Sequence, residues 1–214
     1  MKTLYRMLCC LLLAASAQAQ VEEHFDDGEL LQHPTWTGRL DAWTVNADGW
    51  LQSQSVTAND LFYLSTRSQR FDSTQWETSV QLLFNPSSAN YVDWYLVAAD
   101  SDLINNSNGY FVRMGGTDDE ICLYRKINGV SIKLIDGTNG VLNSSNNLFS
   151  LKLIRANDQW WLFRKPEGGN WLPEGTVHDS GQSTPAYTGF LVKQSTASFF
   201  QRHWFDDVRV KPFE

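Results

Sequence analysis

The chain has 214 residues, a formal net charge of −7, and nine Trp, seven Tyr and twelve Phe. This acidic balance disfavours nucleic acid as a partner, because phosphate binding needs clustered Lys and Arg. The length suffices for one well-formed core, and each large aromatic side chain buries on the order of 150–250 Å² when packed.

The first residues have the composition of a secretory signal peptide. Lys2 and Arg6 precede an apolar run over residues 7–15, and Ala17-Gln18-Ala19 has the small-x-small form of a cleavage site. The apolar run is shorter than the roughly 20 residues that a membrane-spanning helix needs, although an N-terminal anchor is the alternative. We therefore expect removal of residues 1–19, a secreted or cell-surface protein spanning residues 20–214, and no membrane insertion after cleavage.

Cleavage at this position would leave Cys122 as the only cysteine, so no internal disulfide could form. Its apolar neighbours Ile121 and Leu123 favour a small buried side chain over a reactive thiol. The fold must therefore be held together by packing.

Alternation with a period of two dominates the middle of the chain. Trp76, Thr78, Val80, Leu82 and Phe84 share one face of a predicted strand, which ends at the turn residues 85–88. Residues 91–98 are almost wholly apolar, as expected for a strand covered on both faces. After a polar loop over residues 100–108, residues 109–114 form the next predicted strand.

A first hairpin is predicted over residues 120–135. Asn128-Gly129 is the preferred two-residue type I′ turn, because both positions need a positive φ. The turn sets the register of the pairs: Ile127 with Val130, Arg125 with Ile132 and Leu123 with Leu134 on one face, and Tyr124 with Lys133 and Cys122 with Ile135 on the other.

A second hairpin is predicted over residues 148–155 and 160–164. Its register places Arg155 opposite Trp160, as an outward-facing cation–π pair. Residues 166–186 are rich in Pro and Gly, which predicts a long loop over one edge. Residues 187–193 and 198–210 complete the strands.

The beginning and end of the predicted domain resemble each other. Phe25-Asp26-Asp27 returns as Phe205-Asp206-Asp207, which suggests that the first and last strands pair in one sheet. Strands recur every 8–14 residues, and no amphipathic helix of two turns or more is apparent. The pattern predicts a single all-β domain, an antiparallel two-sheet sandwich over residues 20–214.

Several segments, in order, are similar to a known family: 25–27, 85–91, 108–113, 120–125 and 205–210. Together they resemble the concanavalin A-like, or laminin-G-like, jelly-roll module of secreted Bacteroidetes surface proteins. The resemblance covers essentially all of residues 20–214. It implies a jelly-roll sandwich with two facing antiparallel sheets, one of them concave, and binding at the concave face or at the rim loops.

The sequence contains no recognisable catalytic motif. Glycosidases use two carboxylates, about 5–5.5 Å apart in retaining enzymes, and glucanases of this fold carry them on one strand in patterns that are absent here. The densest acidic run, 118–120, is consecutive and lies at a predicted turn. We therefore expect a protein that is not an enzyme, with a glycoside hydrolase as the least favoured alternative.

The paired termini are a candidate site for a structural Ca²⁺. Acids side by side in a sheet repel each other unless a cation or water separates them, and jelly-roll carbohydrate-binding modules are similar in using terminal-strand acids for Ca²⁺. Asp27 and Asp207 are the predicted metal ligands, and a hydrated acidic rim is the alternative.

A glycan binder needs exposed aromatic rings with hydrogen-bonding groups beside them. The candidate rings are Trp94, Tyr95, Tyr110, Tyr124, Trp160 and Trp171, and core packing is the alternative for each. From these and their polar neighbours we predict a ligand site made of Asp93, Tyr95, Arg113, Arg125 and Trp171.

The sequence thus predicts a secreted, non-catalytic binding or adhesion module. A glycan is the favoured partner, and a cell-surface protein is the alternative. A structural or protein-interaction sandwich without a sugar site would share the same fold.

Overall fold

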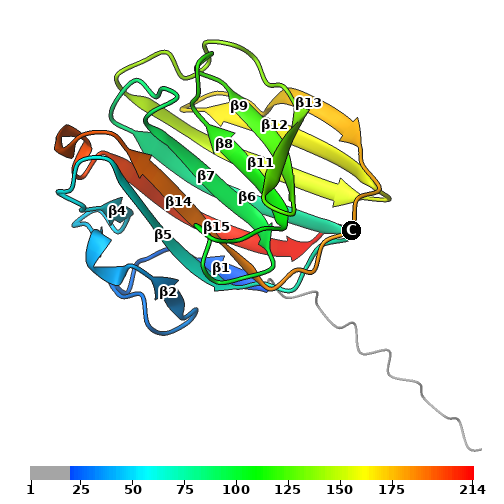
Figure 1. Cartoon of the computed structure of the whole chain (residues 1–214), viewed down its shortest axis with the longest axis horizontal. Coiled ribbons are helices and arrows are strands. Elements are labelled where there is room, and N and C mark those ends of the chain that lie inside the picture. The colour runs from blue at the N-terminus through cyan, green and yellow to red at the C-terminus, as the bar shows by residue number, and fades with distance from the viewer. Residues whose placement is uncertain (1–19) are drawn as a thin grey trace, which may run out of the picture.

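A computed structural model describes residues 20–214 of the chain (Figure 1). The predicted signal peptide, residues 1–19, lies outside this part. The described residues form two antiparallel sheets with fifteen strands and two single-turn 3₁₀ helices, η1 (Leu40–Ala42) and η2 (Ala197–Phe199). The protein is an all-β, two-sheet jelly-roll sandwich, as predicted. Neither short helix within residues 20–214 has the length or apolar character that crossing a membrane requires.

Each sheet is built around a path of seven strands. Sheet A runs in the order β13 (Leu172–His178), β12 (Gln159–Pro166), β11 (Asn147–Ala156), β6 (Thr74–Leu82), β15 (His203–Pro212), β4 (Leu51–Ser53), β3 (Trp43–Val45). Sheet B runs in the order β10 (Val130–Ile135), β9 (Ile121–Ile127), β8 (Gly109–Met114), β7 (Tyr91–Ala98), β14 (Tyr187–Gln194), β5 (Asp60–Arg67), β2 (Trp36–Gly38).

The two ends of the described chain meet in sheet A. The eighth strand of that sheet, β1 (Val21–Glu23), pairs antiparallel with β15, with Val21 opposite Val210 and Glu23 opposite Val208. Figure 1 shows the blue first strand beside the red last one. The predicted pairing of the terminal strands is confirmed.

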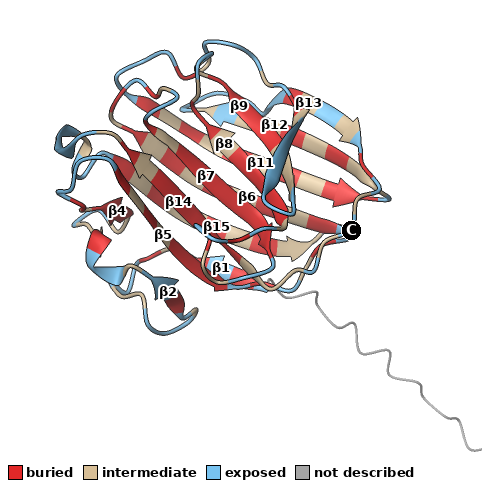
Figure 2. Cartoon of the chain, viewed as in Figure 1, coloured by how far each residue is buried: buried red, intermediate tan, exposed pale blue. Residues whose placement is uncertain are grey.

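The core lies between the sheets and consists largely of aromatic rings. Strand β6 alternates buried and half-buried residues along its length, so Trp76 points inward, where it stacks on Trp160 with ring centroids 5.6 Å apart. Phe190 of β14 stacks on Phe205 of β15 at 4.1 Å across the two layers. Figure 2 shows buried residues along the central strands of the sandwich. Trp94, Tyr110 and Trp160, candidate ligand rings in the sequence, are fully buried core residues.

The first hairpin forms with the predicted turn, but the register changes after Lys133. Arg125 pairs with Ile132 and Tyr124 with Lys133, as predicted, whereas Ile135 pairs with Leu123. The pairs proposed for Leu134 and for Cys122 are therefore wrong, because a bulge between Lys133 and Ile135 shifts the strand by one residue. The bulge lets Ile135 point into the core. Cys122 is buried, as expected, and burial raises its pKa to about 12.

The predicted long loop over residues 166–186 contains a strand. Strand β13 pairs with β12 and forms an edge of sheet A. It includes Pro173 and Gly175, which made the segment look like a loop, but an edge strand tolerates Pro because one side of its backbone needs no partner.

Arg155 is opposite Trp160 in the second hairpin, as predicted, but it faces inward and is fully buried. Its guanidinium lies 3.9 Å from the ring centroid of Phe71 and makes ion pairs with Asp72 and Asp158. Those two acids supply the counter-charge that makes burial of the arginine tolerable. The expected outward orientation is therefore wrong.

Candidate functional site

The outer face of sheet B carries a second set of aromatic side chains, away from the core. Because side chains alternate along a strand, those next to the core-facing residues of β7, β8 and β9 point outward. We call this surface the aromatic face, and its residues are Tyr91, Asp93, Tyr95, Phe111, Arg113, Tyr124 and Lys126.

Asp93 and Arg113 are cross-strand neighbours in the middle of the aromatic face. The guanidinium donates from Nε to Oδ1 and from Nη2 to Oδ2, both at 2.7 Å. The Asp93 side chain is 3% exposed and that of Arg113 is 29% exposed. Burial opposes the charge on Arg113, but the bidentate bond to Asp93 outweighs it and raises the pKa of Arg113. The arginine is therefore a fixed cation with one edge towards solvent.

Three rings form a ladder across β7, β8 and β9. Tyr95 and Phe111 have centroids 5.1 Å apart, and Phe111 and Tyr124 are stacked at 5.1 Å with their planes only 4° apart. Leu103, from the loop after β7, packs on this cluster. Tyr95 and Phe111 are consequently buried, while Tyr124 stays partly exposed.

The guanidinium of Arg113 lies against aromatic rings as well as against its acid. Its central carbon is 4.0 Å from the ring centroid of Tyr91 and 5.6 Å from that of Tyr124. Tyr91 is partly exposed, as is Tyr124. Lys126 lies 3.4 Å from the Tyr95 hydroxyl, and burial lowers the pKa of this lysine. The accessible part of the face is an oriented cation with a tyrosine on either side.

Only three of the five predicted ligand residues lie together: Asp93, Tyr95 and Arg113. Arg125 is not part of this group and pairs instead with the buried Asp179. Asp179 also accepts a hydrogen bond from Tyr110 at 2.8 Å. Trp171 lies at the other sheet, beside Lys152 of β11. The predicted single site is therefore wrong as a set of residues.

Sequence reasoning missed Tyr91 and Lys126 as members of the aromatic face. The alternation that places Asp93 outward also places Tyr91 outward, so the signal was present two residues away. Tyr124 was a candidate ring but was left out of the predicted site. Tyr124 packs against the edge of the buried cluster that contains Tyr95, Phe111 and Leu103, and it stays partly exposed.

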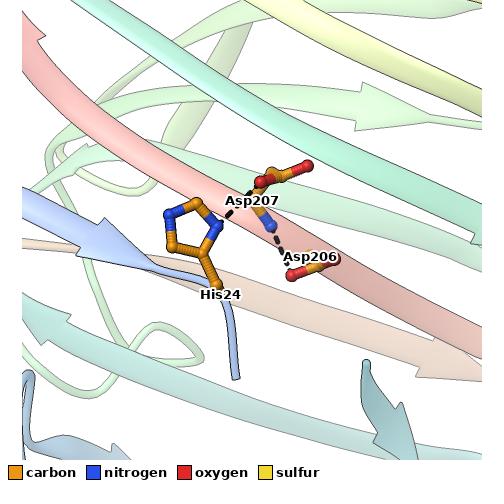
Figure 3. Close-up of side chains that lie close together, drawn as sticks. All are labelled: His24, Asp206 and Asp207. Carbon is orange, nitrogen blue, oxygen red and sulfur yellow. Dashed lines mark hydrogen bonds and ion pairs between the residues drawn. The ribbon is translucent and has the colours of Figure 1, made fainter. Parts of the chain in front are cut away.

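The predicted metal residues are separated. Asp207 accepts a hydrogen bond from Nδ1 of His24 at 2.8 Å, and its own amide donates to Asp206 at 2.7 Å (Figure 3). Asp27 lies outside this group and accepts from the amide of Glu29 at 3.2 Å. The structure groups Asp207 with His24 and Asp206 and not with Asp27, so a cation shared by Asp27 and Asp207 stays a prediction.

The residues around Asp207 do not fit Ca²⁺. Calcium takes about six to eight oxygen ligands, whereas this cluster offers an imidazole and two carboxylates from consecutive residues. Burial, followed by the neighbouring charges of Asp207 and Asp26, raises the pKa of Asp206 to about 6.

Comparisons with known proteins identify the fold. No protein-family model and no curated protein sequence matches the chain. The carbohydrate-binding module CBM66 from Bacillus subtilis matches with a TM-score of 0.58 and 15% identity, over 82% of this chain and 94% of its own. The VIP36 exoplasmic/lumenal domain, in its Ca²⁺/Man2-bound form, matches with a TM-score of 0.57 and 11% identity, over 90% of this chain and 86% of its own.

An enzyme is among the similar structures. Xylan β-1,4-xylosidase from Bacillus halodurans C-125 matches with a TM-score of 0.55 and 17% identity, over 91% of this chain but only 39% of its own. At these identities the likeness shows the fold alone: a jelly-roll sandwich of the kind found in carbohydrate-binding modules and lectins.

Proposed function

We propose that the chain is a secreted, non-catalytic glycan-binding module and that its aromatic face is the binding surface. Export through residues 1–19 and an origin among secreted Bacteroidetes surface proteins are parts of this proposal. A role in adhesion at the cell surface follows from the same proposal.

The observation that carries the proposal is the guanidinium of Arg113 between Tyr91 and Tyr124. Sugar rings offer apolar C–H faces for stacking and hydroxyl groups for hydrogen bonding, so a binding site needs both kinds of partner. The two tyrosines supply ring surface and hydroxyls. Within residues 20–214, Nη1 of Arg113 has no hydrogen-bond acceptor, whereas Nε and Nη2 are held by Asp93.

Two groups of the surface are held in place by neighbouring side chains. Asp93 fixes the guanidinium through two bonds, and stacking on Phe111 fixes the ring of Tyr124. Side chains that are already ordered lose less conformational entropy on binding, which favours affinity. The likeness to a carbohydrate-binding module supports the same proposal.

The geometry favours binding over catalysis. Both oxygens of Asp93 accept from Arg113, so this carboxylate is not free to donate or receive a proton. Glu120, at the edge of the same face, is buried and accepts from Lys133 at 2.7 Å. A glycosidase needs one carboxyl group as an acid and another as a base or nucleophile, and each of these two is committed to a cation.

A glycan array tests the proposal. Wild-type residues 20–214 should bind one or more glycans, and Tyr124→Ala should weaken that binding by about tenfold, since loss of a stacked ring costs on the order of 1 kcal/mol. Trp50→Ala is the control, because Trp50 is half-buried near β4 and packs at a tilt against Trp204, away from the aromatic face. Absence of glycan binding, or equal loss in both variants, would refute the proposal and favour a structural or protein-binding sandwich.

A further inference from the structure

A shallow groove crosses the outer face of sheet A, on the side of the sandwich opposite the aromatic face. It has a volume of about 140 Å³. Strands β6, β11 and β15 form its floor, and Trp171 lies at its side. We call it the Trp171 groove, and its outward-facing polar and aromatic residues are Glu77, Ser79, Ser150, Trp171, Asp207 and Arg209.

Trp171 is held in place without being buried. The residue is 36% exposed, and the ammonium of Lys152 lies 4.3 Å from its ring centroid. Leu172, the next residue, begins β13 and pairs with Arg164 of β12. An exposed ring fixed by a cation and by an adjoining strand is a preordered stacking surface, which nothing in the packing of the fold requires.

The floor of the groove is a continuous row of oxygen atoms. The hydroxyls of Ser79 and Ser150 are 3.2 Å apart, and that of Ser79 donates to Asp207 at 3.5 Å. His24 holds the other oxygen of Asp207 at 2.8 Å. Asp207 lies in the bulge of β15 with a φ of 51°, and bulges commonly redirect a side chain. The carboxylate is thus oriented from two sides.

The charges of the groove indicate what kind of ligand it accepts. Glu77 and Asp207 present carboxylates, which accept hydrogen bonds from hydroxyl groups and repel acids. Arg209, the one cation in the lining, lies 3.6 Å from Asp207 and 3.5 Å from Glu22, so its charge is already balanced. Two further cations adjoin the groove: Lys211 lies 4.0 Å from Glu77, and the ammonium of Lys152 lies against the ring of Trp171. The volume is well below the roughly 300–1,000 Å³ of pockets for drug-sized ligands, which restricts the occupant to one ring.

We propose that the Trp171 groove is a second saccharide site, which binds one neutral sugar ring stacked on Trp171 with its hydroxyls bonded to Asp207 and Ser150. The site is independent of the aromatic face, because the whole core separates the two surfaces. A protein with both sites binds glycans on opposite sides of the sandwich and can link two glycan chains.

The test is a fluorine NMR titration of residues 20–214 labelled with 5-fluorotryptophan. The chain has nine Trp, and Trp171→Phe assigns the resonance of interest. The probes are the methyl glycosides of xylose, mannose, glucose and galactose, with glucuronate as the acidic comparison. At least one neutral glycoside should shift the Trp171 resonance saturably, whereas glucuronate should not.

Two variants distinguish binding in this groove from binding at the aromatic face. Ser150→Ala should weaken the titration at Trp171 at least threefold, and the other Trp resonances show whether the fold is intact. Tyr124→Ala, which removes a ring of the aromatic face, should leave the titration at Trp171 unchanged. The inference is overturned if none of the neutral glycosides gives a saturable shift, if glucuronate binds equally well, or if Tyr124→Ala abolishes the response. These outcomes do not depend on whether the aromatic face binds a glycan.

Discussion

The outer faces of the two sheets differ, although both sheets turn the same kind of aromatic residue towards the core. The outer face of sheet B is a stacked ladder of rings around a buried ion pair between Asp93 and Arg113. The outer face of sheet A presents hydroxyl and carboxylate groups in the Trp171 groove, with the exposed ring of Trp171 at its side, and half-buried rings such as Phe163 lie outside the groove. A sandwich needs only one apolar side on each sheet, so the additional rings and charges outside the core point to function.

The largest contrast should appear when one ring is removed from each outer face. Phe111→Ala should lower the free energy of unfolding by about 3–5 kcal/mol, because this ring is buried in the ladder. Phe163→Ala should lower the free energy of unfolding by less, since Phe163 on sheet A is only half-buried. Urea denaturation measures both changes. Equal costs for the two variants would contradict the view that the aromatic face is packed like a second core.

Breaking the ion pair should have the next largest effect. Arg113→Ala should lower the free energy of unfolding by about 3 kcal/mol, the low end for a broken buried pair, because the arginine side chain is 29% exposed. The double variant Asp93→Leu with Arg113→Leu should recover most of that loss, since no charge is left buried. It should still fail to bind the glycan that the wild type binds. Recovery of binding along with stability would show that the pair has no part in recognition.

A smaller, pH-dependent effect is expected at Asp206, beside the groove. Burial raises the pKa of this carboxyl to about 6 from 3.8, so the folded state binds more protons than the unfolded chain between these values. Stability therefore falls as pH rises through that window. The free energy of unfolding of Asp206→Asn should equal that of the wild type at about pH 4 and exceed it by about 1 kcal/mol at pH 8. This difference is reduced because Asp206 is partly exposed. Thermal unfolding at the two pH values checks this, and a variant that is less stable at pH 8 would contradict it.

Calcium removal should have the smallest effect. The cluster of His24, Asp206 and Asp207 is poor in oxygen ligands, so the unfolding midpoint should be the same in EDTA and in millimolar Ca²⁺. A cation that binds only the folded state would raise the midpoint. A rise of several degrees with Ca²⁺ would show that the described residues hold calcium after all.

Much of the fold could be predicted from the sequence, because it depends on local rules. Alternation along residues 76–84, the Asn128-Gly129 turn and the repeated Phe-Asp-Asp segment predicted one strand, one hairpin and the paired termini, and the structure confirms each. The bulge after Lys133 and the edge strand β13 could not be predicted. Both depend on contacts between the sheets, such as the approach of Ile135 to Gly175, which no local pattern encodes.

The candidate site could be predicted only in part, for the same reason. Asp93 and Arg113 lie on neighbouring strands, so alternation sufficed to place them on one surface. Arg125 could not be placed correctly, because its partner Asp179 is 54 residues away, beyond strand β13. Trp171 was one of the candidate exposed rings and is exposed, but its position at the opposite sheet follows from the pairing of β13 with β12.

An amide NMR titration of residues 20–214, with the glycan that the array selects, would locate the binding surface residue by residue. If recognition takes place on the aromatic face, the largest saturable shifts should fall on β7, β8 and β9, at Asp93, Arg113 and Tyr124. Shifts confined to the rim loops or to the strands of sheet A, with these three amides unmoved, would contradict it.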